Sequence, residues 1–187
     1  MKDDKPWLSE PDREEFDAYG LLCVVKRQPV LKILLGYVGI PRTHPLYGVA
    51  QDALIPYPET WKDQALFIEE VGVMNMLCTD LDAMPVGHAP VHFVMTVHGG
   101  LSFSDPMDEH PDLWFFGFDC GHGNDFLPGM FETLDGWNVD RLRDTIGGTY
   151  RSFEYVKNEC VHLAEQLAAY PELMSRTLTS SARVRTR

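Results

Sequence analysis

The segment from Asp119 to Asp125, with the sequence DCGHGND, carries side chains that could do chemistry. Two carboxylates and one imidazole, those of Asp119, Asp125 and His122, stand beside glycines that let the backbone fold close to a ligand. Aspartate and neutral histidine are ordinary ligands of zinc, manganese and iron. The spacing matches no standard ligand formula. A turn in which the two acids bond backbone amides is therefore the alternative interpretation.

His98 stands directly before a pair of glycines, Gly99 and Gly100, at the end of an apolar segment. A histidine in this position suits a base or a metal ligand, and the glycine amides could contact an anion such as phosphate. We therefore predict His98 as a site residue, with Gly99 and Gly100 as substrate contacts. A hydrogen-bonded histidine at a β-bulge is the alternative.

These segments are predicted to form one site. The predicted catalytic residues are His98, Asp119 and His122, which would hold a metal ion or activate the water bound to it. Asp125 completes the predicted metal ligands as a fourth residue. Zinc or manganese would be the cofactor. The prediction requires that the imidazole before the double glycine and the later acid–imidazole cluster converge in one cleft.

A further histidine, His44, lies in the sequence PRTHPLYG, where prolines at 41 and 45 fix its direction. We predict that it contacts the substrate, with a plain surface turn as the alternative. Cys120 could act as a thiolate nucleophile beside a histidine, but the spacing to His122 does not favour a direct contact. Cysteine catalysis is therefore disfavoured.

The composition limits the classes of partner. A formal net charge of -12 over 187 residues argues against binding to a nucleic-acid backbone, which needs clustered lysine and arginine. No apolar run approaches membrane-spanning length, and the acidic N-terminus lacks the apolar region of a secretory signal. We expect a cytoplasmic protein without nucleic-acid or membrane partners, and a homo-oligomer stays open. The cysteines form no CxxC pair, which argues against a zinc ribbon.

The sequence also predicts the elements that position the site. Runs of β-branched, aliphatic and aromatic residues predict strands over 21–27, 31–38, 91–98 and 113–119. In 91–98 the apolar residues alternate, whereas 113–119 is apolar on both faces, as is typical of a central strand. Apolar residues at three- and four-residue spacing predict a helix over 150–169, which Pro171 ends.

We therefore predict one α+β domain over residues 1–174, an antiparallel sheet of about four or five strands with the C-terminal helix packed on one face. Residues 50–90 are predicted to be an insertion over one side of the sheet, and 138–146 a short helix. The basic tail, residues 175–187, lacks apolar periodicity and is predicted to be disordered.

Several stretches resemble an uncharacterised family of small proteins encoded by phages, prophages and plasmids. They are GYVGIP with HPLYG, VHGGLSFS, WFFGFDCGHGND and YRSFEYVKNECVHLAEQL. The family pattern has an HGGLT-type turn, a GFD-x-x-H strand end after a tryptophan, and a YxxxEYVxxEC helix; residues 50–90 and the basic tail depart from it. The resemblance implies a phage-type accessory protein that acts in host-defence interference or nucleotide metabolism. The polar positions of the pattern fall on His44, His98, Asp119 and His122.

The favoured function is metal-assisted hydrolysis of a phosphorylated or nucleotide-like small molecule by a phage-encoded enzyme in the host cytosol. The alternative is a protein without catalysis that sequesters a nucleotide or binds a host protein, with the glycine amides and histidines contacting phosphate. The chain has no Walker A, GxGxxG, HExxH or GxSxG sequence, which argues against the corresponding enzyme classes.

Overall fold

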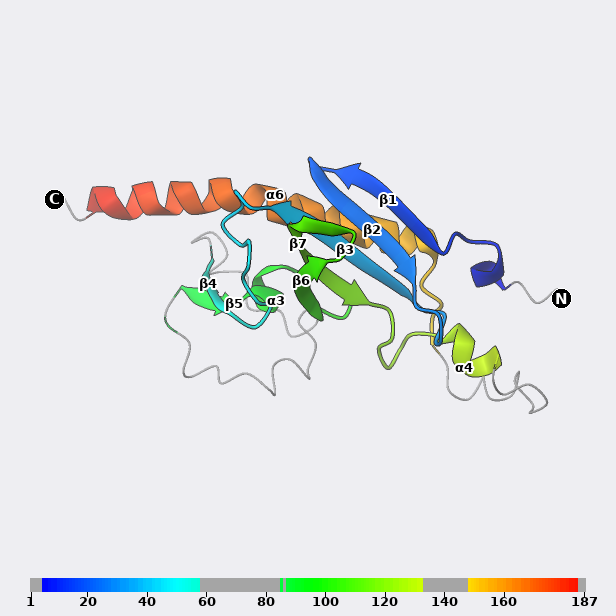
Figure 1. Ribbon diagram of the computed structural model, residues 1–187. Coiled ribbons are helices and arrows are strands. Elements are labelled where there is room, and N and C mark those ends of the chain that lie inside the picture. Colours follow the sequence, from blue (N-terminus) through cyan, green and yellow to red (C-terminus); the bar gives the residue numbers. More distant parts are fainter. Residues whose placement is uncertain (1–4, 58–84, 86, 133–147, 185–187) are drawn as a thin grey trace.

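The structure, a computed structural model, describes residues 5–57, 85, 87–132 and 148–184. In chain order its elements are η1 (Pro6–Leu8), β1 (Arg13–Ala18), β2 (Leu21–Arg27), β3 (Leu34–Pro41), β4 (Leu54–Pro56), β5 (His88–Pro90), α3 (Val91–Val94), β6 (Phe103–Met107), β7 (His110–Asp119), α4 (Pro128–Glu132) and α6 (Phe153–Val184). Five strands form an antiparallel sheet in the order β1-β2-β3-β7-β6. Helix α6 runs across one face of this sheet (Figure 1). The predicted α+β architecture is therefore confirmed.

The register of the two central strands decides which face each side chain occupies. β3 and β7 pair so that Val38 lies opposite Phe116 and Leu35 lies opposite Asp119. Because side chains alternate along a strand, the even-numbered residues of β7 face α6 and the odd-numbered residues face away. The predicted strands 21–27, 31–38 and 113–119 correspond to β2, β3 and β7.

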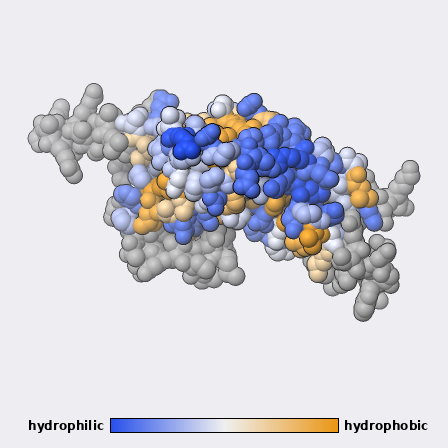
Figure 2. Space-filling view, viewed as in Figure 1, coloured by the Kyte–Doolittle hydropathy of each residue, from blue (hydrophilic) through white to orange (hydrophobic). Residues whose placement is uncertain are grey.

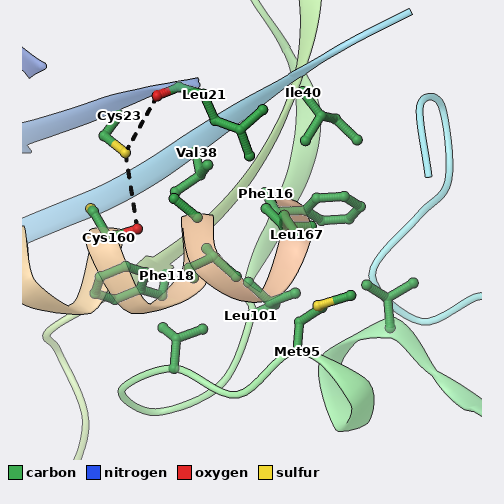
Figure 3. Packing of buried hydrophobic residues seen from close by; sticks show 14 of the residues in the cluster. Leu21, Cys23, Val38, Ile40, Met95, Leu101, Phe116, Phe118, Cys160 and Leu167 are labelled. Carbon is green, nitrogen blue, oxygen red and sulfur yellow. Dashed lines mark hydrogen bonds between the residues drawn. The ribbon is translucent and has the colours of Figure 1, made fainter. Parts of the chain in front are cut away.

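Helix α6 buries the predicted apolar stripe against the sheet. Its members are 0 to 6% exposed, and they are Phe153, Val156, Cys160, Leu163 and Leu167. Figure 3 shows part of this core, with Phe116 and Phe118 of β7 and Val38 of β3 beside Cys160 and Leu167. Each fully buried aliphatic or aromatic side chain contributes about 1.5–3 kcal/mol, so this contact is a major source of stability.

The other face of the sheet carries a smaller apolar cluster. Val24, Tyr37, Met107 and Phe115 are buried there by their neighbours on adjacent strands. The ammonium group of Lys26 lies 5.7 Å from the centre of the Tyr37 ring. In Figure 2 hydrophilic residues predominate on the visible face, with separate hydrophobic areas between them. None of the described helices is both long and apolar enough to cross a bilayer.

The prediction of a strand over 91–98 is wrong. Residues Val91–Val94 form the one-turn helix α3, and a loop without strand pairing follows it up to β6. The buried residues Val91, Val94 and Met95 have helical spacing as well as partial alternation, so the sequence pattern fits both structures.

The prediction that Pro171 ends the C-terminal helix is also wrong. Helix α6 continues through Pro171 to Val184, so it includes most of the basic tail 175–187, for which the sequence predicts disorder. Of the predicted insertion 50–90, the described part contributes the small sheet β4-β5. Residues 58–84 and 86 of that insertion, and the predicted helix 138–146, lie outside the described residues.

Candidate functional site

Three segments that are distant in the sequence meet beside the first turns of α6. The loop after α3 contributes His98, the loop after β7 contributes His122 and Asp125, and α6 contributes Tyr155. One ligand atom from each of His98, His122 and Asp125 lies within 4.8 Å of the other two. The structure thus brings together three of the four residues that the sequence suggests as metal ligands.

Asp125 lies at the centre of this cluster, with its side chain 1% exposed. Oδ1 accepts a hydrogen bond from Nε of Arg151 at 2.7 Å, and Oδ2 accepts from Nε2 of His98 at 2.8 Å and from the backbone N–H of His122 at 3.0 Å. Burial raises the pKa of this carboxyl group, but the bonds from Arg151 and His98 outweigh burial and hold the pKa below its ordinary value. Asp125 is therefore a buried anion.

The imidazole of His98 is held from both sides. Nε2 bonds Asp125, and Nδ1 lies 3.1 Å from the hydroxyl group of Tyr155. Because an ionised carboxylate can only accept, Nε2 carries a proton, and in the neutral ring Nδ1 accepts from Tyr155. The backbone N–H of His98 donates to Oε2 of Glu159 at 2.8 Å. These contacts fix both the loop and the orientation of the ring.

His122 packs directly on Gly99. Gly99 has a φ of +68°, and a Cβ atom at this position would overlap the His122 ring, so glycine is required here. The His98 and His122 rings lie 5.4 Å apart and nearly perpendicular. Nδ1 of His122 is buried 3.5 Å from Oδ2 of Asp125 and has no hydrogen-bond partner among the described residues. The His122 side chain as a whole is 39% exposed, so one side of the cluster is open to solvent.

Asp119 does not join the cluster. It is an odd-numbered residue of β7, opposite Leu35, and therefore lies on the face of the sheet that α6 does not cover. Burial raises the pKa of Tyr37 on that face, and the charge of Asp119 raises it further. The carboxylate accepts hydrogen bonds from the Ser102 hydroxyl and the Gly121 amide at 3.0 Å each. This is the turn arrangement that the sequence leaves open as the alternative.

His44 lies apart from the cluster. It supplies a hydrogen bond that helix α6 lacks at Pro171. Proline has no N–H to donate to the carbonyl group four residues earlier, which is that of Leu167. Nε2 of His44 lies 2.9 Å from this carbonyl oxygen and replaces the missing donor, while Nδ1 accepts from the Leu46 amide at 3.1 Å. Leu167 is about 12 Å farther along α6 than Glu159, which binds the His98 loop. The structure thus supplies a structural role for His44 and explains why Pro171 is tolerated.

This role of His44 predicts acid sensitivity. Burial lowers the pKa of His44, and a protonated ring could no longer accept from Leu46. Because the pKa is lower in the folded state, the unfolded chain takes up the proton first as pH falls below about 6.5, and stability is lost in that range. We expect the free energy of unfolding to depend less on pH between about pH 7 and pH 5 in His44→Gln than in the wild type. Urea denaturation at each pH measures this slope.

The matched control is His110→Gln, which removes a histidine that bonds Glu15 at the far edge of the sheet. It should retain the wild-type slope. A slope in His44→Gln equal to that of the wild type would contradict the assigned role.

The two remaining suggestions from the sequence concern Gly100 and Cys120. The amide of Gly100 donates to the Val97 carbonyl at 2.9 Å. This amide is therefore already hydrogen-bonded within the turn and is not free to contact a substrate. Cys120 is buried, and burial raises the pKa of its thiol far above the ordinary value, which keeps the group protonated. The structure therefore gives no support to cysteine nucleophilic catalysis.

Three residues of the cluster are missing from the sequence prediction, namely Arg151, Tyr155 and Glu159. The sequence places Arg151 and Glu159 on the polar side of the C-terminal helix without a role. Tyr155 and Glu159 are four residues apart and share one side of α6, which is a signal that could have found them, whereas Arg151 precedes the first helical residue, Phe153. In the structure each of them contacts His98 or Asp125.

Comparison of the chain with protein-family models, with curated proteins and with solved structures found no match. The likeness to phage and plasmid proteins therefore rests on the sequence motifs alone. The chemistry of the cluster has to be interpreted from its own geometry.

Proposed function

We propose that the protein is a hydrolase of phosphorylated or nucleotide-like small molecules that uses a divalent metal ion bound by His98, His122 and Asp125. The observation that carries the proposal is the convergence of these three side chains, from two separate loops, within 4.8 Å. Two histidines and one carboxylate form the ligand set of many zinc hydrolases, in which the fourth position is left for water or substrate. The sequence motifs suggest a phage-type accessory protein, with interference in host defence as its role.

The distances fit such a metal ion. Zinc bonds of about 2.0 Å to nitrogen and oxygen in tetrahedral geometry separate neighbouring ligand atoms by about 3.3 Å. Oδ2 of Asp125 lies 2.8 Å from Nε2 of His98 and 3.5 Å from Nδ1 of His122. Two of the three distances between ligand atoms are therefore close to the tetrahedral value, and all three lie within 4.8 Å. Nδ1 of His122 supports the proposal further, because a buried nitrogen without a partner is costly unless a ligand satisfies it.

Arg151 and Tyr155 are placed to orient the proposed metal ligands. Arg151 occupies Oδ1 of Asp125 and leaves Oδ2 toward the two histidines. Tyr155 bonds the second nitrogen of His98, and its hydroxyl group can donate or accept, so the contact survives loss of the Nε2 proton to a metal. A divalent ion bound here would lower the pKa of its water ligand toward neutrality and polarise a phosphoryl oxygen.

The test is a zinc and manganese titration of chelator-treated, untagged protein by isothermal calorimetry. We expect one ion per chain and proton release on binding. His122→Ala should weaken binding by more than about 100-fold, more than the loss of an outer-shell partner causes. This variant should stay folded, because the His122 ring forms no hydrogen bond through Nδ1 within the described residues and its side chain is 39% exposed. Hydrolysis of p-nitrophenyl phosphate and of nucleotides should require the metal ion.

His110→Ala is the matched control, since it removes a histidine that is remote from the cluster. Its metal affinity should equal that of the wild type. Wild-type protein that binds zinc no more tightly than His122→Ala would overturn the proposal.

A second candidate is a non-catalytic protein that binds a nucleotide or a host protein. The observation in its favour is that both nitrogens of His98 and both oxygens of Asp125 already have protein partners. His98 and Asp125, bonded in this way without a metal ion, could form a rigid binding surface. A nucleotide that raises the melting temperature and is recovered unchanged, with no metal in the protein, would support this candidate.

A further inference from the structure

We propose that Arg151 binds the phosphate group of the substrate and so makes the site selective for phosphorylated molecules. This inference rests on the proposed function for the position of the reacting group. It adds Arg151 to the three proposed metal ligands, and it adds a phosphate group as the feature of the substrate that is recognised. Its test uses inorganic phosphate and does not depend on turnover.

The guanidinium group of Arg151 has hydrogen-bond donors that Asp125 does not use. Arginine carries five N–H groups, and the hydrogen bond from Nε to Asp125 uses one of them. The Nη atoms, which carry the other four, have no hydrogen-bond partner among the described residues. The side chain is 24% exposed, so these donors can meet a ligand from solvent.

Two contacts fix the direction of this group. Nε is held by Asp125 at 2.7 Å, and Cζ lies 5.0 Å from the centre of the Tyr155 ring. An arginine clamped in this way loses little rotamer freedom when a ligand binds, and its planar fork matches two phosphate oxygens at once.

The same two partners place the guanidinium group beside the cluster. Asp125 bonds Arg151 through Oδ1 and His98 through Oδ2, and Tyr155 contacts Arg151 through its ring and His98 through its hydroxyl group. Arg151 is thus linked to His98 by one carboxylate and by one phenol. A phosphate held by the Nη atoms would lie next to the proposed metal position.

The negative charge of the chain explains why a phosphate site here needs a cationic side chain. The chain has a formal net charge of -12, so its overall field repels a phosphorylated substrate. Glu159 adds a further carboxylate at the His98 loop. Of the described lysine and arginine side chains, Arg151 is the one that contacts the cluster; the others that form ion pairs bond acids elsewhere.

The experiment is a titration of the full-length protein with inorganic phosphate, followed by calorimetry and by NMR, in the presence and in the absence of zinc. Arg151→Gln should weaken phosphate binding by at least about 10-fold, the loss expected when a bidentate charged hydrogen bond is removed. Arg151→Lys keeps the positive charge beside Asp125 but has no planar guanidinium group to bond two phosphate oxygens at once. It should also bind phosphate less tightly than the wild type.

Arg42→Gln is the matched control. Arg42 also pairs with a carboxylate, that of Asp112 at 3.2 Å, and its Cζ lies 5.4 Å from the centre of the Tyr47 ring. This control should bind phosphate as the wild type does. Zinc binding should stay close to the wild type in Arg151→Lys, which keeps a cation beside the Asp125 carboxylate, and should be weaker in Arg151→Gln, which removes this partner of a proposed metal ligand.

The outcomes separate this inference from the proposed function. Wild-type protein that binds no phosphate, or Arg151→Lys and Arg151→Gln with wild-type phosphate affinity, would overturn the inference. Equal losses of phosphate and zinc affinity in Arg151→Lys would also overturn it, because Arg151 would then act through Asp125. Phosphate binding that depends on Arg151 in a protein without zinc affinity would support the inference and reject the metal-assisted hydrolase.

Discussion

Replacement of Asp125 by asparagine is expected to lower the free energy of unfolding by about 3–5 kcal/mol, the range measured when a buried ion pair loses one partner. The carboxylate accepts from Arg151, from His98 and from the His122 amide, and its side chain is 1% exposed. An asparagine amide would place an NH₂ group against one of these donors and leave Arg151 without its counter-charge. Urea denaturation monitored by circular dichroism measures the loss.

Asp112→Asn is the matched control. Asp112 also pairs with an arginine, Arg42, but its side chain is 86% exposed, so we expect a loss below about 1 kcal/mol. A loss for Asp125→Asn as small as that of this control would mean that the cluster does not stabilise the fold.

The second large effect concerns Phe118 and Gly36 under helix α6. Phe118→Ala should cost about 3–5 kcal/mol, because the ring is 1% exposed and Gly36 beneath it has no side chain to fill the cavity. Gly36→Ala should cost about 1–3 kcal/mol on its own, since the added methyl group would overlap the Phe118 ring and lie 2.7 Å from Sγ of Cys160. Chemical denaturation of both variants provides the measurement.

The double variant tests whether the two costs have one cause. In the Phe118→Ala background the new methyl group enters the cavity, so Gly36→Ala should be neutral or stabilising and the coupling should exceed about 1 kcal/mol. Additive costs would show that the alanine at position 36 acts on the strand backbone rather than on the ring.

The helix and its contact with the sheet could be predicted because one physical signal dominates them. Residues such as Val156, Cys160 and Leu163 recur with helical period, and burial of that stripe outweighs the cost of Pro171 inside the helix. The sequence does not show that His44 satisfies the carbonyl group that Pro171 leaves free. A pattern of residues within one segment cannot reveal a donor from another part of the chain.

The site could be predicted only in part, for a reason that lies in β7. Trp114, Phe116 and Phe118 occupy one face of this strand, while Leu113 and Phe115 occupy the other. Both faces are apolar, so the alternation does not indicate which side Asp119 takes. The pairing with β3 settles this, and it separates Asp119 from the histidines. Gly99, Gly121 and Gly123, by contrast, correctly mark the two loops that meet at the cluster.

Helix α6 also holds segments that lie outside the five-stranded sheet. Its side chains and carbonyl groups bind the loop at Thr96, the backbone of His98, the ring of His44 and, through the Tyr170 hydroxyl group, the carbonyl of Pro56. None of these contacts can form before the helix docks on the sheet, since docking fixes the position of each partner. In hydrogen-exchange terms, these loops and the helix belong to one cooperative unit. The cluster therefore forms only with the docked helix, and it should open together with the helix rather than on its own.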